Sequence, residues 1–337
     1  MKTGKSIKAL ALAPILGVLS LAAMPHSAWA QATVKVDGSS TVFPITEAVA
    51  EEYQIQKRGK VHVTVGIAGT GGGFKKFCRG ETDISDASRP ISTSEMDVCK
   101  AAGIKYIELP IAYDALTVVV NPKATWVDQV SIAELKKMWE PAAQGVVTKW
   151  NQVNAKWPNA ALKLFGPGTD SGTFDYFTEA VNGKAKSSRG DFTASEDDNV
   201  LVQGVEADVN ALGYFGYAYY AANTARMKAL KIVNAQGKAV GPSEAAVLDG
   251  TYNPFSRPLF IYVNAESAKK PEVKEFVEFY LGKGAEFVKE VKYVPFVAAA
   301  YQTALGHFHA NRLGTVFGGA PAVGLKVEDL LAREAKL

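Results

Sequence analysis

Short apolar runs and amphipathic segments alternate along the chain, and this alternation predicts an α/β fold. The run 33–36 is typical of a strand, and a helix is expected over 43–53, with Pro44 near its start. The same order of strand, turn and helix recurs with a strand over 61–65, a short helix over 74–77 and a strand that ends over 83–87. Units in this order predict a mostly parallel sheet flanked by helices, with ligands bound at the carboxyl ends of its strands.

Three further segments carry signals for helix starts. Ser92–Glu95 and Ser131–Glu134 each have the Ser-x-x-Glu spacing of a capping box, so each is expected to open a helix. A long helix is predicted over 271–291.

Two strongly apolar runs predict that the chain crosses between two domains. The runs 116–121 and 259–264 are rich in β-favouring residues and both end in Asn, and Arg257-Pro258 precedes the second. A chain of this length exceeds one ordinary hydrophobic core. We therefore expect lobe I over 31–114 plus 260–308, and an inserted lobe II over 115–259. The stretch 309–337 has little pattern, and its packing is not predicted.

Residues 1–30 have the pattern of a secretory signal peptide. A basic start with Lys2, Lys5 and Lys8 precedes the apolar stretch 9–23, and Ala28-Trp29-Ala30 is a typical cleavage signal. We expect cleavage after Ala30 and export to the periplasm. Three of the 37 basic residues and none of the 34 acidic ones lie in this leader, so the remainder carries equal numbers of each. This balance argues against nucleic-acid binding.

Cys78 and Cys99 are the only cysteines, and both follow the leader. In an oxidising compartment such a pair is expected to form a disulfide, which would stabilise the fold by about 3 kcal/mol.

Three turns combine glycine with hydroxyl side chains just before a predicted helix. They are Gly38-Ser39-Ser40-Thr41, Gly69-Thr70-Gly71-Gly72-Gly73 and Asp170-Ser171-Gly172-Thr173. A helix N-terminus presents free N–H groups and a partial positive charge, glycine permits close approach of the backbone, and Ser and Thr add neutral donors. Convergence of the three turns would hold a small oxyanion.

Known phosphate and catalytic motifs do not fit these turns. The second turn lacks the Gly-Lys-Ser/Thr ending of a P-loop and the third glycine of a dinucleotide fingerprint, and Ser171 falls one position late for a nucleophile elbow. His307 and His309 could touch a metal, but a solvated pair is the simpler interpretation. We expect no catalytic residues, no metal and no cofactor.

Arg89 follows the stretch 83–88, where a guanidinium could make bidentate bonds to an oxyanion. Asp86 and Asp170 are the two carboxylates near the turns, and each could orient Arg89 or accept a proton from the ligand.

These segments together resemble the periplasmic phosphate-binding protein of the phosphate ABC transporter. The segments that carry the resemblance are 37–44, 69–77, 83–91 and 171–174, and it extends over about 33–300. It implies a type II periplasmic binding protein fold, with two α/β lobes and a two-strand hinge. It also implies phosphate contacts from these residues: Ser40, Thr41, Thr70, Ser171, Gly172 and Thr173.

The chain departs from the family at two positions. Many members have a proton-accepting aspartate where this chain has Arg89, and an arginine four residues before the Ser-Gly-Thr turn, where this chain has Pro167. The charge is therefore expected to come from Arg89, with the proton acceptor open between Asp86 and Asp170.

The resemblance predicts a monomeric receptor that delivers inorganic phosphate to a membrane permease. The alternatives left open are another oxyanion, such as sulfate, molybdate or a phosphonate, and, less favoured, a secreted phosphatase.

Overall fold

The computed structural model describes residue 1 and residues 31–336. The predicted leader and its cleavage site at Ala30 lie outside the described residues. Residues 31–336 belong to one compact unit. Among the described residues, the search for an apolar helix of membrane-spanning length finds none.

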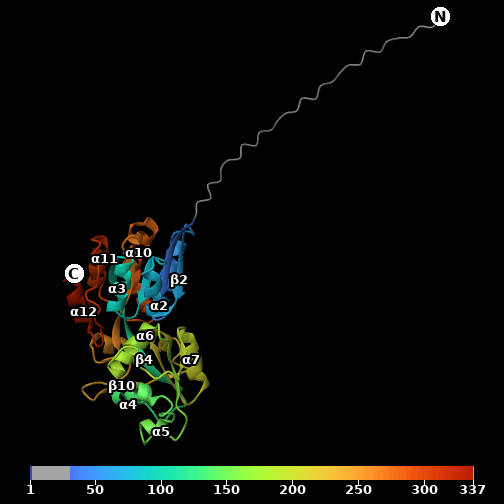
Figure 1. Cartoon of the computed structure of the whole chain (residues 1–337), viewed down its shortest axis with the longest axis vertical. Coiled ribbons are helices and arrows are strands. Elements are labelled where there is room, and N and C mark those ends of the chain that lie inside the picture. Colours follow the sequence, from blue (N-terminus) through green and yellow to red (C-terminus); the bar gives the residue numbers. More distant parts are fainter. Residues whose placement is uncertain (2–30, 337) are drawn as a thin grey trace. The chain divides into compact units, whose positions relative to one another are not determined.

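One mixed sheet of nine strands organises the fold (Figure 1). Its strand order is β2-β1-β3-β12-β4-β8-β6-β7, and β9 pairs with β4. Neighbours are parallel at β1–β2, β1–β3, β6–β7 and β6–β8, whereas β12 and β4 pair antiparallel with their neighbours. We keep the name lobe I for the half from β2 to β12, and lobe II for the half from β8 to β7. The exact bounds of the two lobes stay a prediction.

The elements of lobe I are β1 (Ala32–Gly38), α1 (Phe43–Gln56), β2 (Val61–Ile67), α2 (Gly69–Phe77), β3 (Ile84–Ala87), α3 (Thr93–Ala101), the 3-10 turn η2 (Ser267–Lys269), α10 (Pro271–Glu290) and α11 (Ala298–His309). The predicted strands and helices of this half are present. Most of them extend beyond the predicted bounds by one to five residues, whereas β3 begins one residue later and α10 ends one residue earlier than predicted. The capping box at Ser92 is formed in both directions with Glu95.

The elements of lobe II are β5 (Gln129–Ser131), α4 (Ile132–Trp139), the 3-10 turn η1 (Pro141–Ala143), α5 (Trp150–Val153), β6 (Lys163–Pro167), α6 (Gly172–Asn182), β7 (Thr193–Ser195), α7 (Asp198–Ala207), β8 (Ala211–Gly216), α8 (Tyr217–Ala221), β9 (Lys228–Ala229), β10 (Lys231–Val233), β11 (Ala239–Val240) and α9 (Glu244–Leu248). Strands β11, β10 and β5 form a separate small sheet. The predicted capping box of Ser131 and Glu134 opens α4.

Two long strands connect the halves of the large sheet. They are β4 (Tyr106–Val120) and β12 (Ser256–Asn264), and every residue of both is buried. The first part of β4 pairs with β12, and its second part pairs with β8. The sequence predicted only 116–121 of the first strand because Glu108, Pro110 and Asp114 interrupt the apolar pattern before it. A register shift at Leu259/Phe260, opposite Pro110, accommodates the proline within the pair.

Helix α2 begins at Gly69, five residues before the predicted start. Glycines are poor helix formers, so the apolar pattern became visible only at Phe74. Close packing explains one of them, because a Cβ on Gly73 would lie 2.6 Å from the Cα of Gly38. Gly73 therefore allows α2 to lie directly against the end of β1.

The stretch after α11 packs on β4 and β12 and also reaches lobe II, where the Gly324 N–H donates to the Tyr176 hydroxyl of α6 at 3.0 Å. Gly314 forms a bridge with Ile107, the Phe317 ring meets the Phe260 ring edge-on, and the Tyr113 hydroxyl donates to the Leu325 carbonyl at 2.8 Å. The chain ends in α12 (Val327–Glu334). The tail thus covers the two crossing strands.

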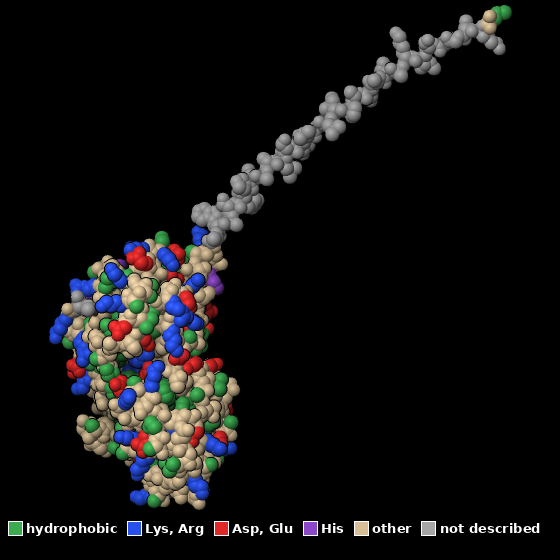
Figure 2. Space-filling view, in the orientation of Figure 1, with side chains coloured by type: hydrophobic (Ala, Val, Ile, Leu, Met, Phe, Trp, Pro, Cys, Tyr) green, Lys and Arg blue, Asp and Glu red, His purple; other side chains and the backbone are tan. Residues whose placement is uncertain are grey.

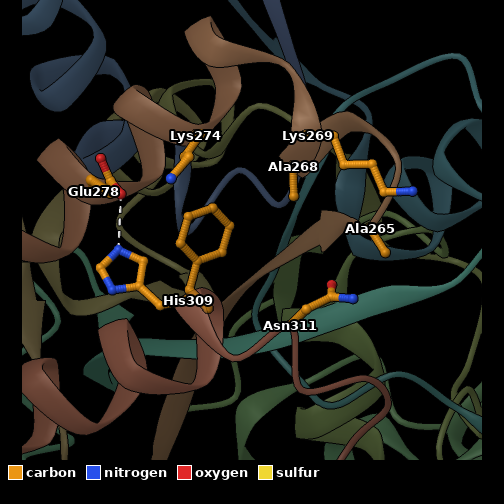
Figure 3. Close-up of a pocket in the computed structure, with 8 residues that line it drawn as sticks. Ala265, Ala268, Lys269, Lys274, Glu278, His309 and Asn311 are labelled. Carbon is orange, nitrogen blue, oxygen red and sulfur yellow. Dashed lines mark hydrogen bonds and ion pairs between the residues drawn. The ribbon is translucent and has the colours of Figure 1, made fainter.

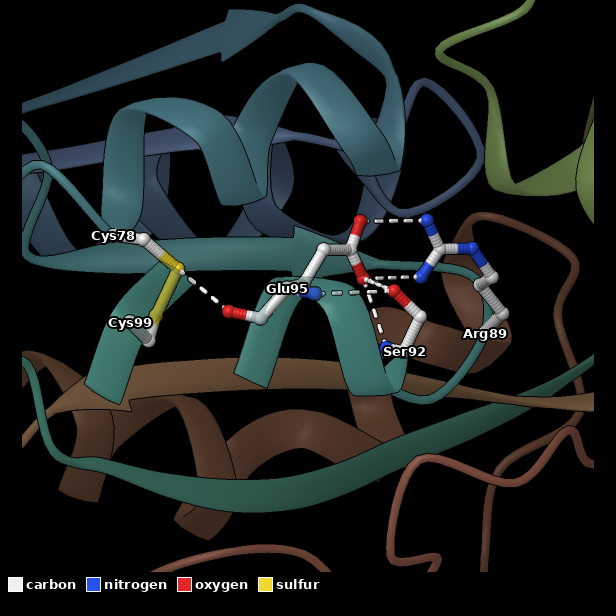
Figure 4. Close-up of a disulfide and its surroundings, with 5 residues drawn as sticks. All are labelled: Cys78, Arg89, Ser92, Glu95 and Cys99. Carbon is white, nitrogen blue, oxygen red and sulfur yellow. Dashed lines mark hydrogen bonds and ion pairs between the residues drawn. A yellow bond between two sulfur atoms is a disulfide. The ribbon is translucent and has the colours of Figure 1, made fainter. Parts of the chain in front are cut away.

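The disulfide between Cys78 and Cys99 is present and confirms the predicted pairing (Figure 4). It joins the end of α2 to α3.

Candidate functional site

Four hydroxyl side chains gather where residues of the two lobes meet. The Thr41 and Thr173 hydroxyl oxygens are 2.9 Å apart, and those of Thr70 and Ser88 are 3.1 Å apart. Gly172 lies against the second pair, because a Cβ there would be 2.4 Å from the Thr70 hydroxyl and 2.5 Å from that of Ser88. All of these side chains are buried. We call Thr41, Thr70, Ser88 and Thr173 the hydroxyl cluster.

Local sequence places these hydroxyls at strand-to-helix turns. Thr41 follows β1 and precedes α1, Thr70 is in the first turn of α2, and Ser88 follows β3. Ser171 caps α6, and its hydroxyl accepts from the Thr173 N–H at 3.1 Å. The predicted three turns therefore converge, with helix N-termini directed to one region.

Two tyrosines hold the first turn in place. The Tyr219 hydroxyl donates to the Ser40 carbonyl at 3.0 Å, and the Tyr293 hydroxyl donates to the Thr41 carbonyl at 2.7 Å. Tyr219 belongs to α8 of lobe II, so one of these bonds connects the lobes.

The positive charge at the hydroxyl cluster comes from Arg257. Its Nη2 donates to Thr173 at 2.8 Å and to Thr41 at 3.2 Å, and its Nη1 donates to the Gly172 carbonyl at 3.3 Å. Arg257 is the second residue of β12 and lies opposite Asp114 of β4 in the strand register. Both side chains are fully buried.

Asp114 holds the guanidinium in this orientation. Its Oδ2 accepts from Nη2 at 2.9 Å and Nε at 3.1 Å, and its Oδ1 accepts from the Tyr217 N–H at 3.1 Å. Burial raises the pKa of Asp114, and the charge of Arg257 and these hydrogen bonds oppose the rise. A guanidinium fixed by a carboxylate on one side can bind an anion on the other.

Arg89, the predicted anion ligand, is bound to two carboxylates instead. It makes a bidentate pair with Glu95 at 2.8 Å (Figure 4). Its Nε donates to Asp175 of α6 at 2.7 Å. Burial raises the pKa of Asp175, and the Arg89 charge lowers it. Arg89 therefore connects α3 of lobe I to α6 of lobe II, and the structure does not bring its guanidinium to the hydroxyl cluster.

The two predicted carboxylates have other surroundings. Both oxygens of Asp170 accept from Lys75, at 2.7 and 2.9 Å, and its carbonyl accepts from the Gly71 N–H. Asp86 is fully buried in β3, near Thr46 and Tyr280. Burial raises the pKa of Asp86 to about 8, with a smaller contribution from the Asp37 charge. The structure records no hydrogen bond from either carboxylate to the hydroxyl cluster.

Sequence reasoning missed three residues of this site: Ser88, Asp114 and Arg257. One signal could have found two of them. Asp114 and Arg257 are charged residues that each lie two positions before an apolar run predicted to cross between the lobes. Because the first run leaves lobe I and the second returns to it, the positions just before the two runs meet where the antiparallel strands cross.

Among residues 31–336, the search for three His, Cys, Asp or Glu side chains that could together hold an ion finds none. A hydrogen bond of 2.8 Å joins His309 Nε2 to the Glu278 carboxylate. Both residues line a surface groove, together with Phe308 and Lys269 (Figure 3). His307 lies 3.4 Å from Glu334, and burial lowers its pKa. The groove shares no residue with the hydroxyl cluster. On the face shown in Figure 2, acidic and basic side chains are interspersed.

Comparisons with known proteins place this geometry in context. Residues 24–283 match a family model described as a PBP superfamily domain. The protein SphX of Synechococcus elongatus is 53% identical over 329 residues, covering 97% of this chain and 96% of its own. The phosphate-binding protein PstS of Staphylococcus saprophyticus is 38% identical over 278 residues, covering 81% and 84%. The crystal structure of a possible phosphate-binding protein from Planctomyces limnophilus superposes with a TM-score of 0.62 at 48% identity, covering 84% of this chain and 99% of that one.

Proposed function

The chain belongs to the PBP superfamily, alongside the PstS phosphate-binding proteins, and from this premise we propose that it binds inorganic phosphate for uptake by an ABC transporter. The sequence resemblance predicted the same family and a two-lobed α/β fold, and both are confirmed.

One observation carries the proposal: Arg257 donates to hydroxyls of both lobes at once. Thr41 belongs to lobe I and Thr173 to lobe II, and one guanidinium nitrogen contacts both. Neutral hydroxyl donors and a single fixed cation suit a small dianion, since they replace its hydration without an excess of positive charge. Closure of the two lobes around the ligand would exclude water and strengthen these bonds.

We assign the ligand contacts as follows. The residues predicted from the turns are Ser40, Thr41, Thr70, Ser171, Gly172 and Thr173, and we add Ser88 and Arg257. Arg257 takes the role that the sequence suggested for Arg89, because Arg89 is already paired with two carboxylates.

Isothermal titration with inorganic phosphate tests the function. The leaderless protein is expected to bind one phosphate per chain, with an affinity well above that for sulfate, molybdate or a phosphonate. Absence of phosphate binding, or tighter binding of another of these anions, would contradict the proposal.

The pattern of residues 1–30 supports export with cleavage after Ala30. The mass of the exported chain measures the cleavage position directly.

We further propose that the protein acts as a monomer that docks on a membrane permease. We also propose that it binds its ligand without chemical turnover, because family members are binding proteins. A phosphatase assay with measurable turnover would contradict the last point.

Replacing Arg89 by methionine is expected to speed phosphate release by about 10- to 100-fold, since breaking a buried charge pair acts mainly on dissociation. The guanidinium joins Glu95 of lobe I to Asp175 of lobe II, and the three side chains are only 12%, 17% and 5% exposed. This triad should therefore stabilise the closed form. Stopped-flow measurement of phosphate release compares the variant with the wild type.

Lys75→Met is the matched control. Lys75 also pairs across the lobes, with Asp170, but its side chain is 61% exposed. An exposed pair contributes little, so release should change less than about threefold. Equal acceleration in both variants would show that Arg89 has no special role in closure.

A further inference from the structure

Tyr176 lies against Arg257, on the same helix that carries Thr173. It is in α6, about one turn after Thr173, and its side chain is buried. The Cζ of Arg257 is 5.5 Å from the centre of the Tyr176 ring, a distance typical of a cation–π contact. The Tyr176 hydroxyl lies 2.7 Å from the Pro254 carbonyl and 2.8 Å from the Ser256 carbonyl, and it can donate to either. Tyr176 therefore contacts both the guanidinium of Arg257 and the backbone directly before it.

The tail after α11 reaches the same hydroxyl. The Gly324 N–H donates to it at 3.0 Å, and the Asn253 side chain donates to the Gly324 carbonyl at 3.1 Å. At the next residue, the Leu325 carbonyl accepts from the hydroxyl of Tyr113, which directly precedes Asp114 in β4. The backbone of the tail is therefore bonded to residues that adjoin both members of the buried ion pair.

We call 319–325 the strap, because this segment runs from one lobe to the other. At its start, a Cβ on Gly319 would lie 2.4 Å from the Thr93 hydroxyl, so the strap packs closely on α3 of lobe I. Residues 320–322 then line a cavity to which both lobes contribute. Near its end, the strap is bonded to Tyr176 of lobe II. The strap therefore fixes Tyr176 relative to lobe I.

We propose that Tyr176 is a positioning residue for Arg257, and that the strap holds Tyr176 in place. Asp114 binds one edge of the guanidinium, and the Tyr176 ring lies against it. Arginine has a long and flexible side chain, and fixing it before the ligand arrives removes an entropic cost from binding. The inference rests on the proposed function, and it makes phosphate affinity depend on the strap, which does not belong to the hydroxyl cluster.

Tyr176→Phe keeps the ring and removes the hydroxyl, so the strap and the backbone before Arg257 lose a common anchor. We expect phosphate affinity in isothermal titration to fall by about 3- to 10-fold, the contribution of one hydrogen bond. Gly324→Ala should have a similar effect without any change at the ligand site. Gly324 has a left-handed φ of 69°, and the new Cβ would lie 2.8 Å from the Asn253 side-chain nitrogen, so the strap should be displaced.

Gly318→Ala is the matched control. Gly318 lies just before the strap with a similar φ of 58°, but there is open space around its Cβ. The backbone strain of the two alanines is therefore alike, and G318A should bind phosphate as the wild type does. An equal loss of affinity in G318A and G324A would overturn the inference, because backbone strain in the tail would explain both.

The Arg257→Met background separates positioning from a general loss of stability. Y176F and G324A should each weaken binding when Arg257 is present and have no further effect in R257M, since the side chain that they position is gone. Equal losses in both backgrounds would mean that Tyr176 does not act through Arg257.

Hydrogen exchange of the wild type tests the same coupling without any variant that must fold. If the docked strap raises phosphate affinity, phosphate must stabilise the docked strap by the same factor. Saturating phosphate should therefore slow exchange of the Gly324 amide by about 3- to 10-fold. The effect should be smaller at the Gly314 amide, which is bonded to the Tyr106 carbonyl before the strap begins. A protein that binds phosphate with no change at Gly324 would overturn the inference, whereas one that binds no phosphate overturns the proposed function itself.

Discussion

Replacement of Arg257 by methionine is expected to weaken phosphate binding by about 100- to 1,000-fold, because each hydrogen bond to a charged group contributes about 1.5–3 kcal/mol. The guanidinium is the cation that contacts the hydroxyl cluster, and its contacts reach both lobes. Methionine fills a similar volume without any donor. Isothermal titration with phosphate measures the loss.

The same substitution also removes the partner of a fully buried carboxylate. Leaving Asp114 unpaired should cost about 3–5 kcal/mol of folding free energy, which denaturant unfolding detects. The double variant R257M/D114N separates the two effects. The amide oxygen that D114N puts in place of the carboxylate could still accept from the Tyr217 N–H, so most of the stability should return. Affinity should stay low, and its recovery in the double variant would mean that Arg257 acts only through the fold.

The hydroxyl turns could be predicted from the sequence because their signals are local. Glycines, hydroxyl residues and capping boxes act within a few residues of each other, and the helices begin close to where these signals stand. The charge at the site could not be predicted in this way. Arg257 meets Asp114 through the register of β12 on β4, between positions 143 residues apart.

Arg89 illustrates how a local interpretation of charge can mislead. Its place after a strand end predicts an anion ligand, and the sequence pattern of the nearby Glu95 indicates only a capping box. In the structure Glu95 has both roles, since it closes the box with Ser92 and pairs with the guanidinium. Which arginine remains available for a ligand depends on such pairings, and they follow from tertiary contacts.

The two lobes meet so closely at Gly172 that one added methyl group should prevent full closure. In Gly172→Ala the Cβ would lie 2.4 Å from the Thr70 hydroxyl, 2.5 Å from that of Ser88 and 2.9 Å from the Thr70 Cβ. Thr70 is β-branched and its hydroxyl also accepts from the Ser88 N–H, so it has little freedom to move aside. Since Gly172 belongs to lobe II and the other two to lobe I, the clash arises only in the closed form. Phosphate affinity should fall by about 100-fold, a penalty of about 3 kcal/mol.

The fold itself should tolerate this change, because Gly172 starts α6 and alanine is the better helix former. Thermal unfolding without ligand should therefore match the wild type. Small-angle scattering should show that saturating phosphate compacts the wild type but not G172A. Gly282→Ala, in α10 with open space around its Cβ, is the matched control and should bind phosphate normally. Normal affinity and compaction in G172A would mean that the lobes do not need this contact to enclose the ligand, and the hydroxyl cluster would then have to act in a more open form.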